Sequence, residues 1–548
     1  MEQLGASTQL LGRANTLLLV LIFICLMLRL RPKRRNILHG GVVCSSAAMP
    51  VSLPPGPVPW PVVGNLPEMM FNKPAFRWIH NMMKEMGTDI ASIRLGGVHV
   101  ISITCPKIAR EVLKEQDANF ASRPLTFASA TFSGGYQGAG LSPYGDQWKK
   151  MRRVLTTEIV CPSRHRWLHD ARADEADNLT RYIYNLVTTQ GSSCSSGVDV
   201  RHVARHYGGN VIRRLLFGSR YFCEPRPDGG PGPMEVEHMD ALFTSLGLLF
   251  TFGVSECLPW LRGLDLDGHE KIIKEANAAM NRLHDTVIDE RWRQWKAGET
   301  TDRGDFLDVL ITLKDCDGNP LLTVEEVKAL CQEITFAGVD NPSNAMEWAL
   351  AEMVNAPEVM AKALEEMDRV VGRERPVQES DIPQLTYATA CVREAFRLHP
   401  VSPFNVPHVA LADTTIAGYR VPKGSHVLLS RTGLGRNPVV WDEPLRFRPE
   451  RHINTAAPCG EGGVALTESE LTLISFSTGR RGCVAASLGT AMCMMLFGRL
   501  LQGFTWSKPP GVAAVDLSES EHDVFMAKPL VLHAELRLPV HLYPGTAV

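Results

Sequence analysis

Phe476-Ser-Thr-Gly479-Arg-Arg481-Gly-Cys483 is the stretch of sequence that decides the fold, and an apolar run from Val484 to Leu501 follows it. A cysteine just before a helix lies at the positive end of the helix dipole, which favours the anionic thiolate that a metal requires. Gly479 has no Cβ, so it lets the loop turn tightly and lets the backbone approach a flat ligand. The residues of this stretch suit an anionic sulfur ligand at position 483, although a cysteine before an apolar helix, taken alone, is usually just buried.

The composition is that of an ordinary folded globular protein. Of the 548 residues, 45% are apolar and 21% are charged, and the net charge is −2. Without a long-range basic field, no nucleic acid is expected as a partner. The thirteen cysteines are odd in number and include no Cys-x-x-Cys pair, which argues against a structural zinc site and against a disulfide framework.

The amino terminus has the pattern of a membrane anchor. An unbroken apolar run of 12 residues, Leu17 to Leu28, precedes a basic cluster that ends at Arg35. As a helix the run is about 18 Å long, short of the ~30 Å hydrocarbon core, so flanking residues have to extend it. Because the positive charge lies mostly after the run, the pattern favours an uncleaved single-pass anchor over residues 1–35, with the catalytic domain in the cytosol. A cleaved signal peptide is the alternative.

The remainder of the chain is predicted as one domain of mainly α structure with small β-sheets. Residues 36–69 are interpreted as a linker and proline-rich hinge, and residues 70–548 as the catalytic domain. The alternation from Ile93 to Ile103 contains Gly-Gly and predicts a hairpin. Thr323-Val-Glu-Glu326 is a capping box that opens a long helix to about Val354, and a further helix is expected from about Thr386 to Leu398.

Other motifs accompany the cysteine loop. Glu394-Ala-Phe-Arg397 places an acid and a base on one helix face, and Pro449-Glu-Arg451-His452 follows later in the chain. Near the start of the domain lies Trp148-Lys-Lys-Met-Arg152. Between the Glu394 motif and the Pro449 motif lies Pro403-Phe-Asn-Val-Pro-His408. An acid–base pair three residues apart occurs on most helices, so these motifs carry meaning only as a set.

As a set, the motifs resemble those of the cytochrome P-450 superfamily of haem-thiolate monooxygenases, and the resemblance covers about residues 60–545. It implies a cytochrome P-450 fold preceded by an N-terminal membrane anchor helix. It also implies haem b, iron protoporphyrin IX, with Cys483 as the axial iron ligand. Two residues depart from the usual pattern, namely Ala485 in place of glycine and His452 in place of phenylalanine.

The resemblance assigns roles to individual residues. Those implied to bind the haem, several of them through its propionates, are Trp148, Arg152, His408, Phe476, Gly479, Arg481 and Cys483. Glu394, Arg397 and Arg451 are implied to form a structural ion network behind the cysteine loop.

The long helix contains an unusual segment, Ala337-Gly338-Val-Asp340-Asn341-Pro342. In the superfamily an acid and a threonine at this place help deliver protons to dioxygen; here Asp340 is present and Asn341 replaces the threonine. Pro342 has no N–H, so the carbonyl of Gly338 loses its helical hydrogen bond. Our hypothesis is that Gly338, Asn341 and ordered water together replace the hydroxyl relay. The alternative is that Pro342 only bends the helix.

The segments Asp340-Asn-Pro-Ser-Asn-Ala345 and Phe404-Asn-Val-Pro-His408 are similar to those of plant amino acid N-hydroxylases that make aldoximes. The resemblance implies NADPH- and O2-dependent N-hydroxylation of L-tyrosine twice, with dehydration and decarboxylation, to (E)-4-hydroxyphenylacetaldehyde oxime. This reaction is the first step of cyanogenic glucoside biosynthesis. The implied partners are NADPH-cytochrome P-450 reductase, the endoplasmic reticulum membrane and downstream enzymes of the pathway.

Substrate and partner contacts are less defined. Arg123 is a candidate partner for the substrate carboxylate, with a surface or propionate role as the alternative. Phe404, Asn405 and Phe525 are expected in the pocket by analogy with the family. Four basic residues near the cysteine loop are expected to form either a docking face for the reductase or simply a solvated face: Lys149, Lys150, Arg153 and Arg480.

Several other functions stay open at this point. The chain could act on another amino acid such as phenylalanine, or hydroxylate carbon as a general monooxygenase. An isomerase or dehydratase that needs no dioxygen is a further alternative, against which the retained Asp340 argues. A non-catalytic haem protein is the alternative from outside the enzymes.

Overall fold

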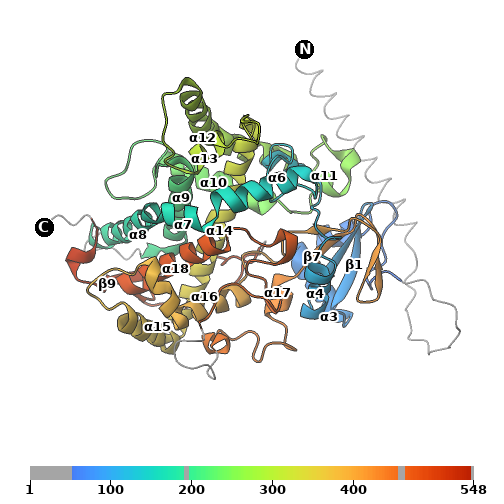
Figure 1. The fold of residues 1–548 in the computed structure, drawn as a ribbon. Coiled ribbons are helices and arrows are strands. Elements are labelled where there is room, and N and C mark those ends of the chain that lie inside the picture. The colour runs from blue at the N-terminus through green and yellow to red at the C-terminus, as the bar shows by residue number, and fades with distance from the viewer. Residues whose placement is uncertain (1–51, 190–196, 454–462, 522, 545–548) are drawn as a thin grey trace, which may run out of the picture.

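The computed structural model describes residues 52–189, 197–453, 463–521 and 523–544. Most of these residues are helical (Figure 1). None of the helices in the described ranges is long and apolar enough to cross a membrane. The predicted anchor over residues 1–35, and the linker as far as residue 51, lie outside the described part of the chain.

One long helix, α14 (Val324–Asn355), runs through the middle of the molecule (Figure 1). The predicted capping box opens it: the backbone N–H of Glu326 donates to Thr323 Oγ1 at 3.2 Å, and the N–H of Thr323 donates to Glu326 Oε2 at 2.9 Å. These two bonds give partners to two backbone N–H groups that have none within the helix. The helix continues through Pro342 without a break.

The other long helices surround α14. Helix α9 (Val200–Phe217), α16 (Thr386–Leu398) and α18 (Ala486–Gly503) contact it directly, as does α12 (His269–Ala297). The bounds of α16 agree with the predicted helix. The remaining helices of eight or more residues are α3 (Ala75–Glu85), α6 (Asp146–Val154), α8 (His169–Thr189), α10 (Pro233–Leu248) and α15 (Pro357–Val370).

Shorter helices connect these elements. They are α2 (Leu66–Phe71), α4 (Pro106–Arg110), α5 (Phe127–Phe132), α7 (Pro162–Trp167), α11 (Val254–Cys257), α13 (Phe306–Thr312) and α17 (Arg431–Gly435).

A four-stranded sheet lies at one edge of the molecule, away from α8 and α12 (Figure 1). Its order is β1 (Ile90–Leu95), β2 (Val98–Ile103), β7 (His426–Leu429) and β4 (His408–Val409). β1 and β2 form the predicted antiparallel hairpin, and β2 pairs with β7 in parallel. β4 pairs antiparallel with β7 at the end of this order, so His408 lies on an edge strand of the sheet.

Two smaller sheets complete the fold. One has the order β3 (Val198–Asp199), β9 (Val531–Leu536) and β8 (Phe504–Ser507), and the other pairs β5 (Thr414–Ile416) with β6 (Tyr419–Val421). The described chain is thus mainly α with small sheets, as predicted.

The start of the folded domain lies earlier than the sequence suggested. The predicted boundary at residue 70 falls inside α2, and Val63, Leu66 and Met69 are buried with Ile79 in one hydrophobic cluster. The prolines that suggested a hinge therefore lead directly into packed structure.

Candidate active site

The cysteine loop has a tight geometry that depends on its glycines. The backbone N–H of Cys483 donates to the carbonyl of Phe476 at 2.8 Å and so closes the loop. Gly479 has a φ of 73°, and a Cβ there would lie 2.5 Å from the carbonyl oxygen of Leu113. Only glycine fits both conditions. Helix α18 begins at Ala486, just beyond the cysteine.

The environment of Cys483 needs a metal to keep the sulfur ionised. The side chain is exposed on one side, yet the atoms crowded around it desolvate the thiol and raise its pKa. This burial outweighs the backbone N–H of Ala485 and the charges of Arg152 and Arg431, which lower the pKa. The expected contribution of the backbone at the helix terminus is present, but without a metal it is outweighed by burial. A bound metal ion deprotonates such a thiol outright.

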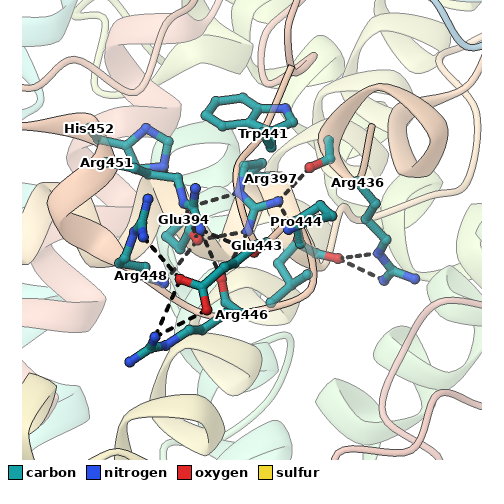
Figure 2. Close-up of polar contacts among 12 residues, drawn as sticks. Glu394, Arg397, Arg436, Trp441, Glu443, Pro444, Arg446, Arg448, Arg451 and His452 are labelled. Carbon is teal, nitrogen blue, oxygen red and sulfur yellow. Dashed lines mark hydrogen bonds and ion pairs between the residues drawn. The ribbon is translucent and has the colours of Figure 1, made fainter. Parts of the chain in front are cut away.

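A buried ion network surrounds Glu394 (Figure 2). Arg397 donates to both carboxylate oxygens of Glu394, at 2.8 and 2.7 Å, and both side chains are 0% exposed. Arg451 donates to the same carboxylate at 3.0 Å, and His452 lies at 2.7 Å from its other oxygen. These bonds hold the pKa of Glu394 at about 2 despite its burial. The structure thus joins the three residues that the sequence grouped, and His452 becomes a fourth member.

The same network fixes the backbone around it. Arg397 also donates to the carbonyls of Gly435 and Pro444 at 2.5 and 2.7 Å, and its guanidinium lies over the ring of Trp441 (Figure 2). The backbone N–H of Arg448 donates to Glu394 at 3.0 Å. Buried charge is costly unless every donor and acceptor is used, and here they are used. The network therefore serves as a rigid support for the segment that leads to the cysteine.

Arg481 is held by the segment before α6. Its guanidinium donates to the carbonyls of Ala121, Ala139 and Ser142, with the last two bonds at 3.0 and 2.7 Å. It also lies 4.6 Å above the ring of Trp148. Two of the five N–H groups of an arginine remain for another ligand after these three bonds.

Glu333 positions that segment, and sequence reasoning missed it. Its carboxylate on α14 accepts from the backbone N–H groups of Ala139, Gly140 and Leu141 at 2.6, 2.9 and 3.2 Å. A Cβ at Gly138 would lie 2.3 Å from the carboxylate, which explains the glycine. The glycines at 138 and 140 were the one available signal, since a glutamate on a helix has no pattern of its own.

Arg123 belongs to the same group of cations. It is buried and donates to the carbonyls of Val406 and Pro407, both at 2.9 Å. Burial lowers its pKa strongly, and the charges of Arg481 and Arg152 lower it further. These contacts exclude the surface role, and the influence of Arg481 and Arg152 shows that Arg123 lies near those two residues. Its predicted role as partner of the substrate carboxylate stays a prediction.

His408 is oriented toward the same group. Its Nδ1 lies 2.7 Å from the carbonyl oxygen of Phe120, whereas its Nε2 is buried without a partner. Because Nδ1 must donate to that carbonyl, Nε2 can donate only when the ring is protonated. Burial and the charges of Arg123 and Arg481 lower the pKa of His408 to about 3. An anion beside Nε2 would reverse this effect.

These cations fit a haem. No carboxylate in the described residues forms an ion pair with Arg123, Arg152 or Arg481, and the guanidinium of Arg152 has no hydrogen-bond partner there. The indole N–H of Trp148 is likewise without an acceptor in these ranges. Uncompensated buried cations call for an anionic ligand. The two propionates of a haem bound to Cys483 supply the required charge.

The segment of α14 around Asp340 is polar and unsatisfied. Asp340 is buried, its Oδ1 has no partner, and burial raises its pKa to about 7. The side-chain amide of Asn341 donates to the carbonyl of Ala337 at 3.2 Å. Ala337 is exposed in the middle of an otherwise buried helix, and Gly338 is partly so. Asp340, Asn341 and Gly338, the three predicted catalytic residues, therefore lie within one helical turn.

The three predicted pocket residues lie in different surroundings. Phe404 packs against His80 of α3, with ring centroids 5.4 Å apart. Asn405 bridges the site, because its Nδ2 donates to Ser477 of the cysteine loop at 3.2 Å and its Oδ1 accepts from Arg431 at 3.3 Å. Phe525 is partly buried and adjoins Asp523, whose charge raises the pKa of Asp340.

The predicted basic face is largely paired. Lys149 pairs with Asp146, Lys150 with Glu326 and Arg480 with Asp117, at 2.9, 2.7 and 2.6 Å. Arg153 is exposed, and no ion pair to it occurs among the described residues. The face is therefore less positive than the four basic residues alone suggested.

Comparison with known proteins gives consistent matches. The family described as Cytochrome P450 matches residues 54–533. The chain is 76% identical to the tyrosine N-monooxygenase of Sorghum bicolor, over 94% of this chain and 92% of that protein. It is 58% identical to tryptophan N-monooxygenase 1 of Arabidopsis thaliana, over 90% of this chain and 89% of the other. It is 55% identical to valine N-monooxygenase 1 of Manihot esculenta, with the same coverage.

Proposed function

This chain belongs to the cytochrome P450 family, and we propose that it is a haem-thiolate monooxygenase that N-hydroxylates L-tyrosine twice. Dehydration and decarboxylation then give (E)-4-hydroxyphenylacetaldehyde oxime. The observation that carries the substrate is the 76% identity to a tyrosine N-monooxygenase, against 58% and 55% for relatives named for tryptophan and valine.

The residues of the site have separate roles in binding the cofactor and in transferring protons. A haem bound to Cys483 supplies the activation of dioxygen, with electron density from the thiolate. The residues that would hold the haem propionates are Arg123, Arg152, Arg481, Trp148 and His408. Asp340, with a pKa of about 7, can take up and release a proton at neutral pH.

Asn341 and Gly338 complete the polar segment of α14. Because Asn341 Nδ2 is bonded to the Ala337 carbonyl, its Oδ1 is left to accept from water. Pro342 cannot donate to the Gly338 carbonyl, so this oxygen is a second acceptor beside Asp340. Water held by Asn341 Oδ1 and the carbonyl oxygen of Gly338 would take the place of the threonine hydroxyl that this chain lacks.

The proposal includes a redox partner and a location. NADPH supplies electrons through a membrane-bound reductase, which docks on the side of the molecule where Cys483 lies. The apolar run Leu17–Leu28 with its following basic cluster supports a single-pass anchor in the endoplasmic reticulum membrane, with residues 70–548 in the cytosol. Downstream pathway enzymes would share that membrane.

A substrate screen tests the proposed function. The full-length protein is reconstituted with a cytochrome P450 reductase and NADPH, and each of the twenty amino acids is offered separately. We expect oxime from tyrosine, detected by mass spectrometry, and little from phenylalanine. Oxime from another amino acid in place of tyrosine would overturn the substrate, and tyrosine hydroxylated at carbon would overturn the reaction.

A further inference from the structure

Arg431 is a partly buried cation that the sequence did not single out. It is the first residue of α17, and its backbone N–H donates to the carbonyl of Pro403 at 2.9 Å. Its Nη2 donates to Asn405 Oδ1 at 3.3 Å, and its Nε is buried without a partner. No carboxylate in the described ranges forms an ion pair with it. The guanidinium of Arg431 therefore keeps N–H donors, including that of Nε, that can bind a ligand.

Arg431 is separate from the cations that fit the propionates. Arg123 is influenced by the charges of Arg481 and Arg152, and so forms one group with them. The charges that act on Arg431 are those of Cys483, which also acts on Arg152, and of Asp340. Arg431 is therefore distinguished by its proximity to Asp340 of α14, whose charge does not act on Arg123, Arg152 or Arg481.

Asp340 is the matching anion. Its Oδ1 is buried and unpartnered, as is the Nε of Arg431, and no ion pair joins the two residues. Asn344 lies one turn further along α14, on the same face, and both polar atoms of its side chain are buried without partners. Buried polar atoms left unbonded call for polar partners, and a bound polar ligand is one group that can supply them.

A free α-amino acid meets this requirement, because it carries an ammonium and a carboxylate on one carbon. We infer that Arg431 binds the α-carboxylate of the substrate while Asp340 faces its ammonium group. This inference rests on the proposed function and adds how the enzyme selects free amino acids. Asn405, bonded to both Arg431 and Ser477, holds the guanidinium in place relative to the cysteine loop.

The arrangement also sets the position of the reacting nitrogen. The carboxylate is fixed from the side of α17 and the ammonium from α14, so the side chain of the amino acid points away from both. Recognition of the two charges is then common to any amino acid, whereas the aromatic side chain is selected elsewhere in the pocket. A substrate lacking the carboxylate leaves Arg431 unpaired.

The first experiment needs no variant. The ferric holoenzyme is titrated with L-tyrosine, with tyramine, which lacks the carboxylate, and with 3-(4-hydroxyphenyl)propanoate, which lacks the amine; the change in the haem Soret band reports binding. We expect each analogue to bind at least about tenfold more weakly than tyrosine. Tyramine binding as tightly as tyrosine would overturn the inference.

The second experiment assigns the carboxylate to Arg431. In Arg431→Gln we expect the Kd for tyrosine to rise at least about tenfold and the Kd for tyramine to change less than about twofold. Arg431→Lys keeps the charge and should retain part of the affinity for tyrosine. The matched control is Arg420→Gln, an exposed arginine of β6 paired with Asp413, which should alter neither constant.

Two results would reassign the role. An equal loss of tyrosine and tyramine in Arg431→Gln would mean that Arg431 only supports the fold. A tyrosine-specific loss in Arg205→Gln and not in Arg431→Gln would assign the carboxylate to Arg205, which also acts on Asp340 from α9. If Arg431→Gln does not bind haem, Arg431→Lys takes its place, with a rise in the Kd for tyrosine and an unchanged Kd for tyramine as the expected result. Failure of the proposed function appears differently, as no oxime and no spectral response to tyrosine.

Discussion

The ion network at Glu394 and the polar segment of α14 at Asp340 are both buried and charged, but they differ in how completely their polar atoms are bonded. Glu394 accepts from Arg397, Arg451 and His452, and these bonds lower its pKa to about 2. Asp340 has no such partner, and its pKa rises to about 7. A buried network whose polar atoms are all hydrogen-bonded stabilises the fold. One whose polar atoms are not all bonded can bind a ligand or a proton.

The largest effect is expected from breaking the completed network. Glu394→Gln leaves Arg397 and Arg451 buried without an anion, and removing one partner of a buried pair costs about 3–5 kcal/mol. We expect loss of haem incorporation and a fall in the free energy of unfolding, measured by the carbon monoxide difference spectrum and by thermal unfolding. The control is Glu443→Gln, whose exposed side chain pairs with Arg446 and Arg448.

Removing the charge of Asp340 is also expected to change the free energy of unfolding, but as an increase and not as a loss. Its pKa is about 7 in the folded protein against 3.8 for the free group, so the folded state binds the proton more tightly between these values. The free energy of unfolding therefore falls as pH rises from about 4 to about 7, and the loss persists above that range. Asp340→Asn should remove this dependence and be more stable at about pH 8, by on the order of 3 kcal/mol.

Thermal unfolding of the holoenzyme at several pH values checks this prediction, with the difference between the variant and the unaltered protein as the readout. Asp340→Asn should also slow oxime formation, because an amide cannot take up the proton. If the variant and the unaltered protein had the same stability as each other at every pH, Asp340 would have a partner in solution and the prediction would fail.

A smaller effect is expected at His452, which stands where the family usually has phenylalanine. His452→Phe keeps a ring beside Trp441 but removes the hydrogen bond to Glu394 at 2.7 Å. Hydrogen bonds to charged groups contribute about 1.5–3 kcal/mol, so we expect a loss near the lower end of that range. Chemical unfolding measures it; an unchanged or increased stability would show that the histidine adds nothing to the network.

The smallest effect is expected at Asn341. Restoring the threonine, Asn341→Thr, replaces an amide that bonds the Ala337 carbonyl with a hydroxyl that cannot hold water in the same place. We expect oxime formed per NADPH consumed to fall by about twofold, with the haem spectrum unchanged. Unchanged coupling and rate would count against a role for Asn341.

The sequence predicted those parts of the molecule in which the relevant residues recur at fixed spacing. The capping box at Thr323 located the start of α14, whereas the network at Glu394 and Arg397 was expected only from the family resemblance. Arg431 and Glu333 were missed, because each is isolated in the sequence and acquires its partners only when distant segments meet. The burial that raises the pKa of the Cys483 thiol could not be predicted either, since only the helix terminus is visible in the sequence.

The measurement that tests the central claim most directly is the absorption spectrum of the reduced, carbon monoxide-bound protein. With Cys483 as a thiolate ligand, the band is predicted at about 450 nm, and Cys483→Ser should abolish it while the far-ultraviolet circular dichroism is kept. A correctly folded, haem-loaded protein whose band lies elsewhere, or a Cys483→Ser variant that still absorbs at that wavelength, would contradict the assignment of Cys483 as the iron ligand.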